Sequence, residues 1–384
     1  MRRAFIVEAK RTAIGKVGGM FKKVAPEQLG ASVIRGLLHA SGVRGEMIDE
    51  VIFGNAIGPG GNIARLTALT AGLPVDIPAV TVDRQCGSGL EAINLAARLI
   101  QTGAGDIFIA GGVESSSLAP WKLEKPSTLY KTPTLFTRAR FSPEEIGDPD
   151  MGVAADNVAK EFSITREDQD EFAFQSHQKA VQAQEEGRFI DEIIPVHGKK
   201  KDEGPRASLT KRTLARFQPQ FTEDGTVTAG NSCAINDGAA AVLIMSEEKC
   251  LELGLTPLLT FIDATSAGVD PNLLGIGSVP AVRKLLKKTD LTIDDIHIVE
   301  FNEAFASQVL ASIRELDIPE EKLNLGGGAL SFGHPYGASG AILATRLCTE
   351  MKRTNKKRGL LTLGIGGGLG LAALFERYET NDGI

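Results

Sequence analysis

Short runs of apolar residues alternate along the chain with longer stretches in which apolar residues recur every three or four positions. The short runs are typical of buried strands, and they include residues 5–7, 51–53, 107–110, 298–301 and 360–363. The periodic stretches, such as residues 90–100 and 282–286, are typical of amphipathic helices. Strands that alternate with helices predict α/β sheets covered by helices.

The pattern contains an internal repeat at a shift of 248 residues. At this shift the two copies share identical residues at several positions, among them Arg35 with Arg283, Leu37 with Leu285, Val51 with Val299 and Gly89 with Gly337. An ungapped register over more than sixty residues is not expected by chance. The chain is therefore predicted to consist of two similar halves with an insertion between them.

The insertion covers about residues 118–232, where the composition changes. It is rich in Lys, Arg, Glu, Pro and Thr and lacks continuous strand-like runs. A helix is expected over about residues 168–186, with Phe172, Ser176, Ala180 and Ala183 on one stripe. We expect a loop-rich, partly helical segment that lies over one half.

Composition places the chain among ordinary globular proteins. It has 384 residues, of which 42% are hydrophobic and 23% charged, and its net charge is −6. An acidic surface argues against nucleic acid or an anionic membrane as a partner. The 43 glycines exceed the typical ~7%, which indicates many tight turns or ligand loops.

The four cysteines are widely separated and form no Cys-x-x-Cys pair. Neither a zinc site nor a disulfide framework is predicted. The N-terminal apolar run, residues 4–7, is too short for a secretory signal, and no run of 18 apolar residues exists. These features predict a cytoplasmic protein with reduced thiols.

One cysteine lies at a point where reactivity is expected. The segment Val82–Leu90 leads from a strand-like run through a glycine-rich turn, which contains Cys86, into an apolar helix. A helix N-terminus favours thiolate, and its free N–H groups can stabilise an oxyanion. Cys86 is thus a candidate nucleophile, and the alternative is a small buried cysteine at a close-packed turn.

The repeat adds a partner for this thiol. The glycine-rich segment Leu325–Gly340 contains His334, and the 248-residue shift places Cys86 directly on His334. A thiol and an imidazole at equivalent positions of two similar halves suggest one site at a pseudo-twofold interface. A Cys–His pair is an established activated nucleophile. The alternative for His334 is a structural role.

Two further segments offer polar or glycine-rich turns. Asn302 and Glu303 follow a strand-like run, where α/β sites collect, although a turn with a helix cap is the alternative. The run Gly364–Gly370 lacks the third glycine of G-x-G-x-x-G, and no P-loop occurs, so neither dinucleotide binding nor NTP hydrolysis is predicted. Its N–H groups can serve as oxyanion donors, or its glycines can allow close packing.

These four segments, in their order and spacing, resemble the thiolase family, the acetyl-CoA acyltransferases that make or cleave 3-ketoacyl-CoA. The resemblance spans the whole chain and includes residues 111–115 and 230–238. It implies a thiolase-like α/β fold of two similar five-layered halves, related by pseudo-twofold symmetry, with an inserted loop domain. The implied domains are an N-terminal half (residues 1–117 plus about 233–258), a CoA-binding insertion (118–232) and a C-terminal half (259–384).

The resemblance also implies residue roles. Cys86 would take the acyl group as a thioester, and His334 would activate it. His334, together with Asn302 acting through a bound water, would form an oxyanion site for the thioester enolate. The N–H groups of Cys86 and Gly366 would form a second oxyanion site, for the tetrahedral intermediate.

The substrate implied by the resemblance is an acyl-CoA, with no permanently bound cofactor and no metal. Met151, Ala304 and Phe305 would line the pantetheine and acyl channel. Arg206 and Phe221, in the insertion, would meet the nucleotide end of CoA, whose phosphates pair readily with basic side chains.

The chain departs from the family pattern at three positions. Gly364 stands where thiolases have a second cysteine that moves the α-proton, and such acid–base help is typically worth ~10²–10⁴ in rate. Cys233 stands where Gly or Ser is common, so it is either a substitute acid/base or a conservative replacement of serine. Asp150 stands where many thiolases have His. Carbon–carbon bond formation is therefore expected to be impaired.

Two functions remain open on this reasoning. The first is an acyltransferase that transfers an acyl group between Cys86 and CoA, by thiolysis or condensation, or else an acyltransferase or thioesterase without Claisen activity. The second is a thiolase-fold subunit that binds acyl-CoA or scaffolds a partner with little catalysis. The resemblance further implies a homodimer or homotetramer that acts in fatty acid metabolism.

Overall fold

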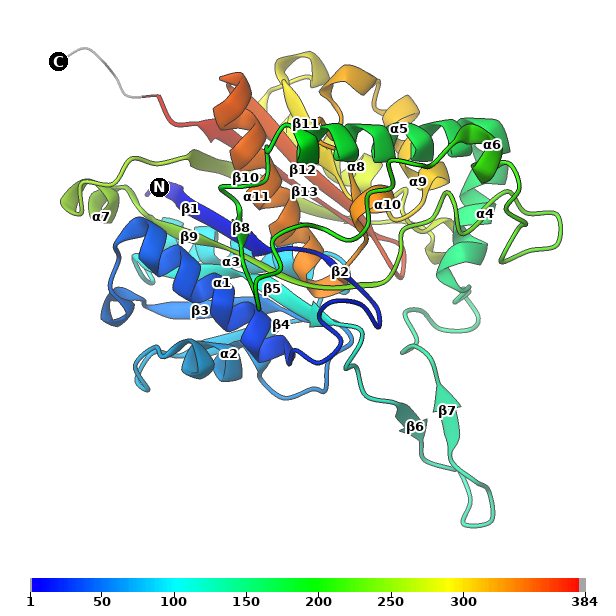
Figure 1. Cartoon of the computed structure of the whole chain (residues 1–384), viewed down its shortest axis with the longest axis horizontal. Helices are drawn as coiled ribbons and strands as arrows, with labels where there is room; N and C mark the ends of the chain where they lie inside the picture. Colours follow the sequence, from blue (N-terminus) through cyan, green and yellow to red (C-terminus); the bar gives the residue numbers. More distant parts are fainter. Residues whose placement is uncertain (1, 380–384) are drawn as a thin grey trace.

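The computed structural model describes residues 2–379. Residue 1 of the predicted N-terminal half and residues 380–384 of the predicted C-terminal half lie outside the described residues. Its strands are β1 (Ala4–Thr12), β2 (Gly15–Lys16), β3 (Glu50–Gly54), β4 (Ala79–Val82), β5 (Ile107–Ser115), β6 (Lys122–Glu124), β7 (Thr134–Phe136), β8 (Ile193–Ile194), β9 (Asn236–Ser246), β10 (Leu259–Gly268), β11 (Ile298–Phe301), β12 (Arg358–Ile365) and β13 (Leu369–Arg377). Except for the β6–β7 hairpin, they form one sheet with the main order β11-β12-β13-β10-β1-β9-β5-β3-β4 (Figure 1).

The helices are α1 (Pro26–Ser41), α2 (Ile63–Ala71), α3 (Ser88–Thr102), α4 (Met151–Glu161), α5 (Arg166–Glu185), α6 (Lys211–Leu214), α7 (Glu247–Glu252), α8 (Ser278–Thr289), α9 (Ala306–Glu315), α10 (Ala329–Phe332) and α11 (Tyr336–Thr354). Short 3-10 turns lie at Gly45–Met47, Pro271–Leu273, Ile293–Asp295 and Glu320–Lys322.

The two halves repeat the same arrangement. From the middle of the sheet outward, the order β1-β9-β5-β3 on one side matches β10-β13-β12-β11 on the other. β3 pairs with β5 in parallel, as β11 does with β12, and β5 pairs antiparallel with β9, as β12 does with β13. α3 begins at Ser88 and α11 at Tyr336, which are equivalent positions of the repeat.

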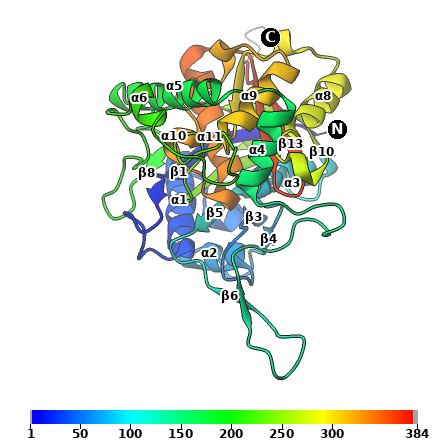
Figure 2. The ribbon, with the colours of Figure 1, turned by 90° about the vertical axis from the view of Figure 1, so that its right-hand side faces the viewer.

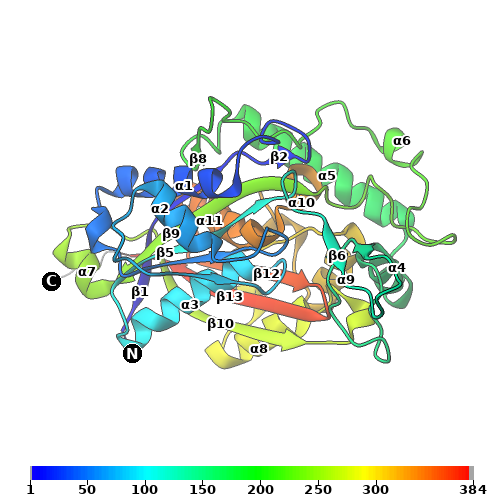
Figure 3. The ribbon, with the colours of Figure 1, turned by 90° about the horizontal axis from the view of Figure 1, so that it is seen from below.

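Helices α3 and α11 occupy the middle of the molecule and contact strands of both halves. α1 packs against β1 and β9 on one outer side, and α8 packs against β10 and β13 on the opposite outer side (Figure 3). β5 and β9 are buried along their whole length, as continuous apolar runs predict for strands covered on both faces. This layering places the N-termini of the two central helices together at the core.

Local sequence accounts for the ends of these elements. α3 ends at Gly103, whose φ of 77° lies in the left-handed region that glycine adopts without strain. α5 begins after Thr165, whose hydroxyl accepts the backbone N–H of Asp168 at 3.1 Å. Its expected stripe of Phe172, Ser176, Ala180 and Ala183 is buried, so that prediction is confirmed.

The predicted strands fall within β1, β3, β5, β11 and β12, and the predicted helices within α3, α5 and α8. The insertion differs from the expectation because it contains strands: the β6–β7 hairpin and the two-residue β8, which pairs with β1. Its strands of three residues are too short to produce a recognisable alternation. Figure 2 shows this hairpin projecting away from the body of the molecule.

Candidate active site

Cys86 lies in the tight turn between β4 and α3. The preceding residue, Gln85, has a φ of 44°, which is uncommon for a residue other than glycine and costs conformational energy. Two hydrogen bonds hold the turn: the Gln85 N–H donates to Asp83 Oδ1 at 2.8 Å, and Ser88 Oγ donates to the Gln85 carbonyl at 2.5 Å. The turn thereby fixes the direction of the Cys86 side chain.

The surroundings of this thiol keep it protonated. Burial, with smaller contributions from the charges of Glu114 and Asp83, raises the pKa of Cys86 to about 12. Hydrogen bonding by the backbone N–H groups of Cys86 and Gly366 lowers the pKa, but by less than burial raises it. The two N–H groups thus favour the thiolate, and burial opposes it.

His334 is buried immediately before α11. Its backbone N–H donates to the Ala234 carbonyl at 2.9 Å. Its ring Nδ1 lies 2.6 Å from Ser339 Oγ, and its Nε2 lies 3.4 Å from Asn302 Nδ2. Burial lowers the pKa of His334 to about 3, so the imidazole is neutral and can accept a proton. Asn302 and His334 thus meet as the resemblance implies.

Glycines bring the two halves of the site together. A Cβ on Gly89, in α3, would lie 2.8 Å from the carbonyl oxygen of Gly337, in α11. A Cβ on Gly340 would lie 2.3 Å from the backbone nitrogen of Leu90. Real Cβ atoms do not approach backbone so closely, so both positions require glycine. The contact places the turns that carry Cys86 and His334 side by side.

Three residues near this contact were not singled out as site residues from the sequence. The Tyr336 ring lies 5.0 Å from the His334 ring, edge to face, and burial raises the pKa of Tyr336, as do the charges of Cys233, Cys86 and Glu114. Glu114 accepts the backbone N–H groups of Ala56 and Gly337. Ser339 holds the His334 ring. The sequence signal that could have identified Ser339 is its position five residues after a histidine at the start of a helix.

Cys233 lies close to Cys86. Burial raises the pKa of Cys233, and the charges of Cys86 and Glu303 raise it further. Its backbone N–H donates to the Ala304 carbonyl at 2.9 Å. Cys233 also packs with Met151, Ala304 and Phe305 in one small apolar cluster. The structure thus groups the residues expected to line the acyl channel around the second thiol.

A cavity of about 460 Å³ begins at Cys233 and extends to the surface of the insertion. This volume is typical of small-molecule sites. Arg206 and Phe221 both line it, together with Lys16, His177 and Ser232 among other residues. The Phe221 ring lies 6.3 Å from the Phe305 ring, which joins the cavity to the apolar cluster.

Glu303 and Asp150 have structural contacts. The Glu303 carboxylate accepts hydrogen bonds from Ser176 Oγ at 2.6 Å and Asn324 Nδ2 at 2.7 Å, which ties the end of β11 to the insertion. Burial raises the pKa of Glu303. Asp150 precedes α4 and pairs with Arg138 at 3.2 Å.

Gly364 lies inside β12 opposite Gly370 of β13. A Cβ at residue 364 would lie 2.3 Å from Gly275 Cα and 2.4 Å from the Gly275 carbonyl oxygen. The volume that a side chain would need is therefore filled by the backbone of the segment before α8. A cysteine at this position is excluded unless that segment moves.

Among residues 2–379, no group of three or more His, Cys, Asp and Glu side chains is arranged to hold a metal ion. In the same part of the chain, no helix has both the length and the apolar character needed to cross a bilayer.

Comparison with known families gives the class of protein. The thiolase N-terminal domain matches residues 4–248, and the thiolase C-terminal domain matches residues 255–377. The two matches cover nearly the whole chain. The chain belongs to the thiolase family, a family of acyltransferase enzymes.

Individual relatives agree with this assignment. The chain is 48% identical over 387 residues to a Staphylococcus epidermidis protein named "Putative acetyl-CoA C-acetyltransferase VraB", covering 99% of this chain and 100% of that protein. A Staphylococcus aureus protein of the same name is 48% identical over 384 residues, covering 98% and 100%. The crystal structure of the Bacillus anthracis acetyl-CoA acetyltransferase superimposes with a TM-score of 0.93 at 39% identity, covering 98% of this chain and 99% of that one. The thiolase-like α/β fold is thereby confirmed.

Proposed function

We propose that this protein is a thiolase-type acyltransferase that forms an acyl-Cys86 thioester and transfers the acyl group to or from CoA. The observation that carries the proposal is the close packing of the Cys86 turn against the Gly366 turn, where a Cβ on Gly87 would lie 2.5 Å from the Ile365 side chain, so that the N–H groups of Cys86 and Gly366 both lower the pKa of the Cys86 thiol. An acyl group bound to this sulfur has its carbonyl oxygen within reach of the same donors. Preorganised N–H donors at such a point stabilise a tetrahedral oxyanion.

Before the first half-reaction, the Cys86 thiol and the His334 imidazole are both neutral. His334 Nε2 takes the proton from Cys86 Sγ, and the thiolate attacks the thioester carbon of acyl-CoA. The electron pair of the carbonyl moves onto oxygen, where the N–H groups of Cys86 and Gly366 bind it. The carbon–sulfur bond to CoA then breaks, and the CoA sulfur receives the proton from His334.

In the second half-reaction the acyl group leaves Cys86. In thiolysis Cys86 has first attacked the 3-keto carbon of 3-ketoacyl-CoA, and the C2–C3 bond has broken to release an acetyl-CoA enolate, which takes a proton at its α-carbon. The thiol of CoA then attacks the acyl-Cys86 carbon, its proton passes through His334 to Cys86, and acyl-CoA leaves. In condensation an acetyl-CoA enolate attacks the acyl-Cys86 carbon, and Cys86 leaves. Both directions require one proton to move at the α-carbon, and Gly364 cannot move it. Cys233 is the thiol in the same apolar cluster as Met151, Ala304 and Phe305, and we assign the proton transfer to it. Its raised pKa makes it a weak acid, so this step is slow.

The lining of the cavity suits the substrate. It combines Cys233 and the aromatic side chain of Phe221 with the exposed cations Arg206 and Lys16. This combination fits a ligand with an acyl end, a pantetheine arm and phosphates. No permanently bound cofactor is needed for this chemistry.

Intact-mass spectrometry after incubation with acetyl-CoA tests the proposal. Wild type should gain the mass of one acetyl group and Cys86→Ala should gain none. Absence of the adduct on wild type, with the fold intact by circular dichroism, would leave the second candidate, a thiolase-fold subunit that binds acyl-CoA without catalysis. Gly364 is the observation that favours this candidate.

We further propose a cytoplasmic homo-oligomer, a dimer or a tetramer. The edge strand β4 is flanked by exposed apolar side chains, among them Leu66, Leu69 and Val80. An unpaired edge with apolar neighbours is a natural site for a second copy of the chain. The four cysteines are free thiols, which suits a reducing compartment.

A further inference from the structure

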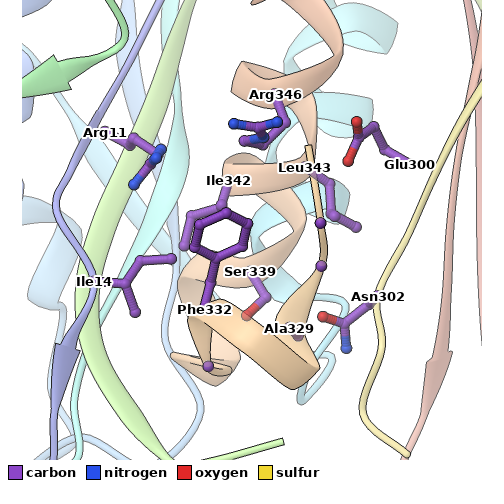
Figure 4. Close-up of a pocket in the computed structure, with 13 residues that line it drawn as sticks. Arg11, Ile14, Glu300, Asn302, Ala329, Phe332, Ser339, Ile342, Leu343 and Arg346 are labelled. Carbon is purple, nitrogen blue, oxygen red and sulfur yellow. The ribbon is translucent and has the colours of Figure 1, made fainter. Parts of the chain in front are cut away.

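A second, much smaller cavity lies beside His334, because Asn302 and Ser339, the two partners of the His334 ring, both line it. It has a volume of about 20 Å³ and lies against α11 (Figure 4). Its polar lining consists of Arg11, Glu300, Asn302, Ser339 and Arg346, and the rest is apolar side chains and glycine backbone. Gly333, the residue before His334, lines both this cavity and the larger one.

Two polar atoms at this cavity lack a hydrogen-bond partner within the described part of the chain. They are Glu300 Oε1 and Arg346 Nε, whereas Arg346 Nη2 lies 3.5 Å from Glu350 Oε1. Glu300 is 1% exposed and Arg346 is 3% exposed. Leaving a buried polar group without a partner is destabilising, so these two atoms point to a polar occupant. In Figure 4 the Glu300 and Arg346 side chains lie at the same end of the cavity, and Ser339 and Asn302 lie at the other.

The hydrogen bonds of His334 lead into the same space. A general base needs Nε2 free of hydrogen, and the Asn302 amide nitrogen 3.4 Å from Nε2 can only donate. The ring hydrogen must then be on Nδ1, which donates to Ser339 Oγ at 2.6 Å. A serine that accepts this bond must direct its own O–H elsewhere, and Ser339 lines the cavity.

We propose that the cavity binds one or two water molecules that link the Ser339 hydroxyl to Glu300 and Arg346, and that this link holds His334 in the tautomer with hydrogen on Nδ1. A water needs about 10–15 Å³ and two to four polar partners, and the cavity offers both. Glu300 is then a positioning residue that acts on the base through Ser339. The proposal rests on the role of His334 as the base for Cys86.

Burial and the charges around Glu300 determine its protonation state. Burial raises the pKa of Glu300 to about 8. Glu350 on α11, Glu192 beside β8 and Glu303 after β11 raise it as well, while Arg346 lowers it. At neutral pH the carboxyl is protonated, and its carbonyl oxygen accepts from water. Above pH 8 it ionises, becomes a stronger acceptor and holds the tautomer more firmly.

Three variants separate this proposal from a purely structural role. Glu300→Leu removes the acceptor, and Glu300→Gln keeps an acceptor but cannot ionise. Thr345→Val is the matched control, because Thr345 is buried on the same helix as Arg346, is uncharged and does not line the cavity. The readouts are the ¹⁵N signals of the His334 ring, assigned by their loss in His334→Gln, and the rate of Cys86 alkylation by iodoacetamide.

In wild type and in the Thr345→Val control, the ¹⁵N signals should report hydrogen on Nδ1. Glu300→Leu should show a mixture of tautomers and alkylate roughly tenfold to hundredfold more slowly, as the loss of an orienting partner typically costs. Identical tautomers and rates in Glu300→Leu and the control would overturn the proposal.

If Glu300→Leu does not fold, Glu300→Gln decides. The ratio of the wild-type to the Glu300→Gln alkylation rate should be constant below pH 7 and rise between pH 7 and 9, and superimposable profiles would refute the link. A high-resolution crystal structure should show water bonded to Glu300 Oε1. Failure of acetylation in wild type would count against the proposed function, whereas the ring ¹⁵N signals still report the tautomer.

Discussion

The backbone of Gly275 occupies the space that a side chain at Gly364 would need. Gly275 Cα lies 2.3 Å from the ideal Cβ position of Gly364, and Gly275 has a φ of 92°, a conformation that favours glycine. The two glycines therefore depend on each other: one leaves the space and the other fills it. Packing thus closes the space beside residue 364 to any side chain.

This contact predicts that restoring a cysteine by one substitution fails. Gly364→Cys should lower the free energy of unfolding by about 1–3 kcal/mol, as overpacking of a buried site does, and should not raise the thiolysis rate. Urea unfolding and acetoacetyl-CoA thiolysis measure the two effects. Gly268→Ala in β10 is the control, because a Cβ there would lie 3.9 Å from the carbonyl oxygen of Gly368 and fits without strain.

The resemblance predicts that Gly364 replaces a second thiol, which stays a prediction, and the sequence did not indicate what fills the space beside this glycine. The repeat paired Cys86 with His334 because equivalent positions of two similar halves meet at their interface. Nothing in the sequence marked Gly275 as the neighbour of Gly364. Hydrophobic periodicity predicts helices and strands, but it does not predict the path of the loop that contains Gly275. Glu300 was missed for the same reason. In the sequence it is one residue of a predicted buried strand, and only the structure shows the cavity beside it.

The acidity of the thiol was also beyond the sequence. A helix N-terminus lowers the pKa of a cysteine, but burial depends on how β4, α3 and the Gly366 turn pack together. In Cys86 the burial effect is the larger of the two. The N–H groups expected from local chemistry lower the pKa of Cys86, and the packing that buries the thiol raises it by more.

The raised pKa of Cys86 predicts a pH profile without an acidic plateau. Its pKa is raised to about 12, and the pKa of His334 is lowered to about 3, so no imidazolium–thiolate pair exists between these values. The rate of alkylation by iodoacetamide should rise about tenfold per pH unit from pH 6 to pH 9. A rate that is already constant at pH 5 would show a preformed ion pair and contradict this expectation.

Cys233 is predicted to affect only the step that moves a proton at carbon. Cys233→Ser should leave acetylation of Cys86 by acetyl-CoA within about twofold, while acetoacetyl-CoA thiolysis falls by about 10²-fold or more. Stopped-flow or quench measurements of the two half-reactions separate them. Equal thiolysis rates in both proteins would mean that Cys233 is a replacement of serine without an acid–base part.

The β6–β7 hairpin is predicted to join subunits. Leu129 is 98% exposed and Tyr130 is 99% exposed at its tip, and large apolar side chains on a projecting hairpin mark an interaction surface. A Leu129→Asp, Tyr130→Asp double variant should have a smaller assembly mass by light scattering and an unchanged circular dichroism spectrum. Leu251→Asp, on the exposed face of α7, is the control. An unchanged mass in the hairpin variant would place the interface elsewhere, with the β4 edge as the remaining candidate.

The protonated Glu300 predicts how stability changes with pH. Its pKa is raised to about 8 in the folded protein, against an ordinary value of 4.5. The folded state therefore binds more protons than the unfolded state between these values. This contribution to stability is fully present below pH 4.5 and is lost as the pH rises through 8.

Glu300→Gln has no such titration, so wild type should lose stability relative to Glu300→Gln by up to about 1.4 kcal/mol per pH unit between pH 5 and 8. Urea unfolding of both proteins across this range measures the difference. A difference that does not change with pH would mean that Glu300 is ionised in the fold and paired with Arg346.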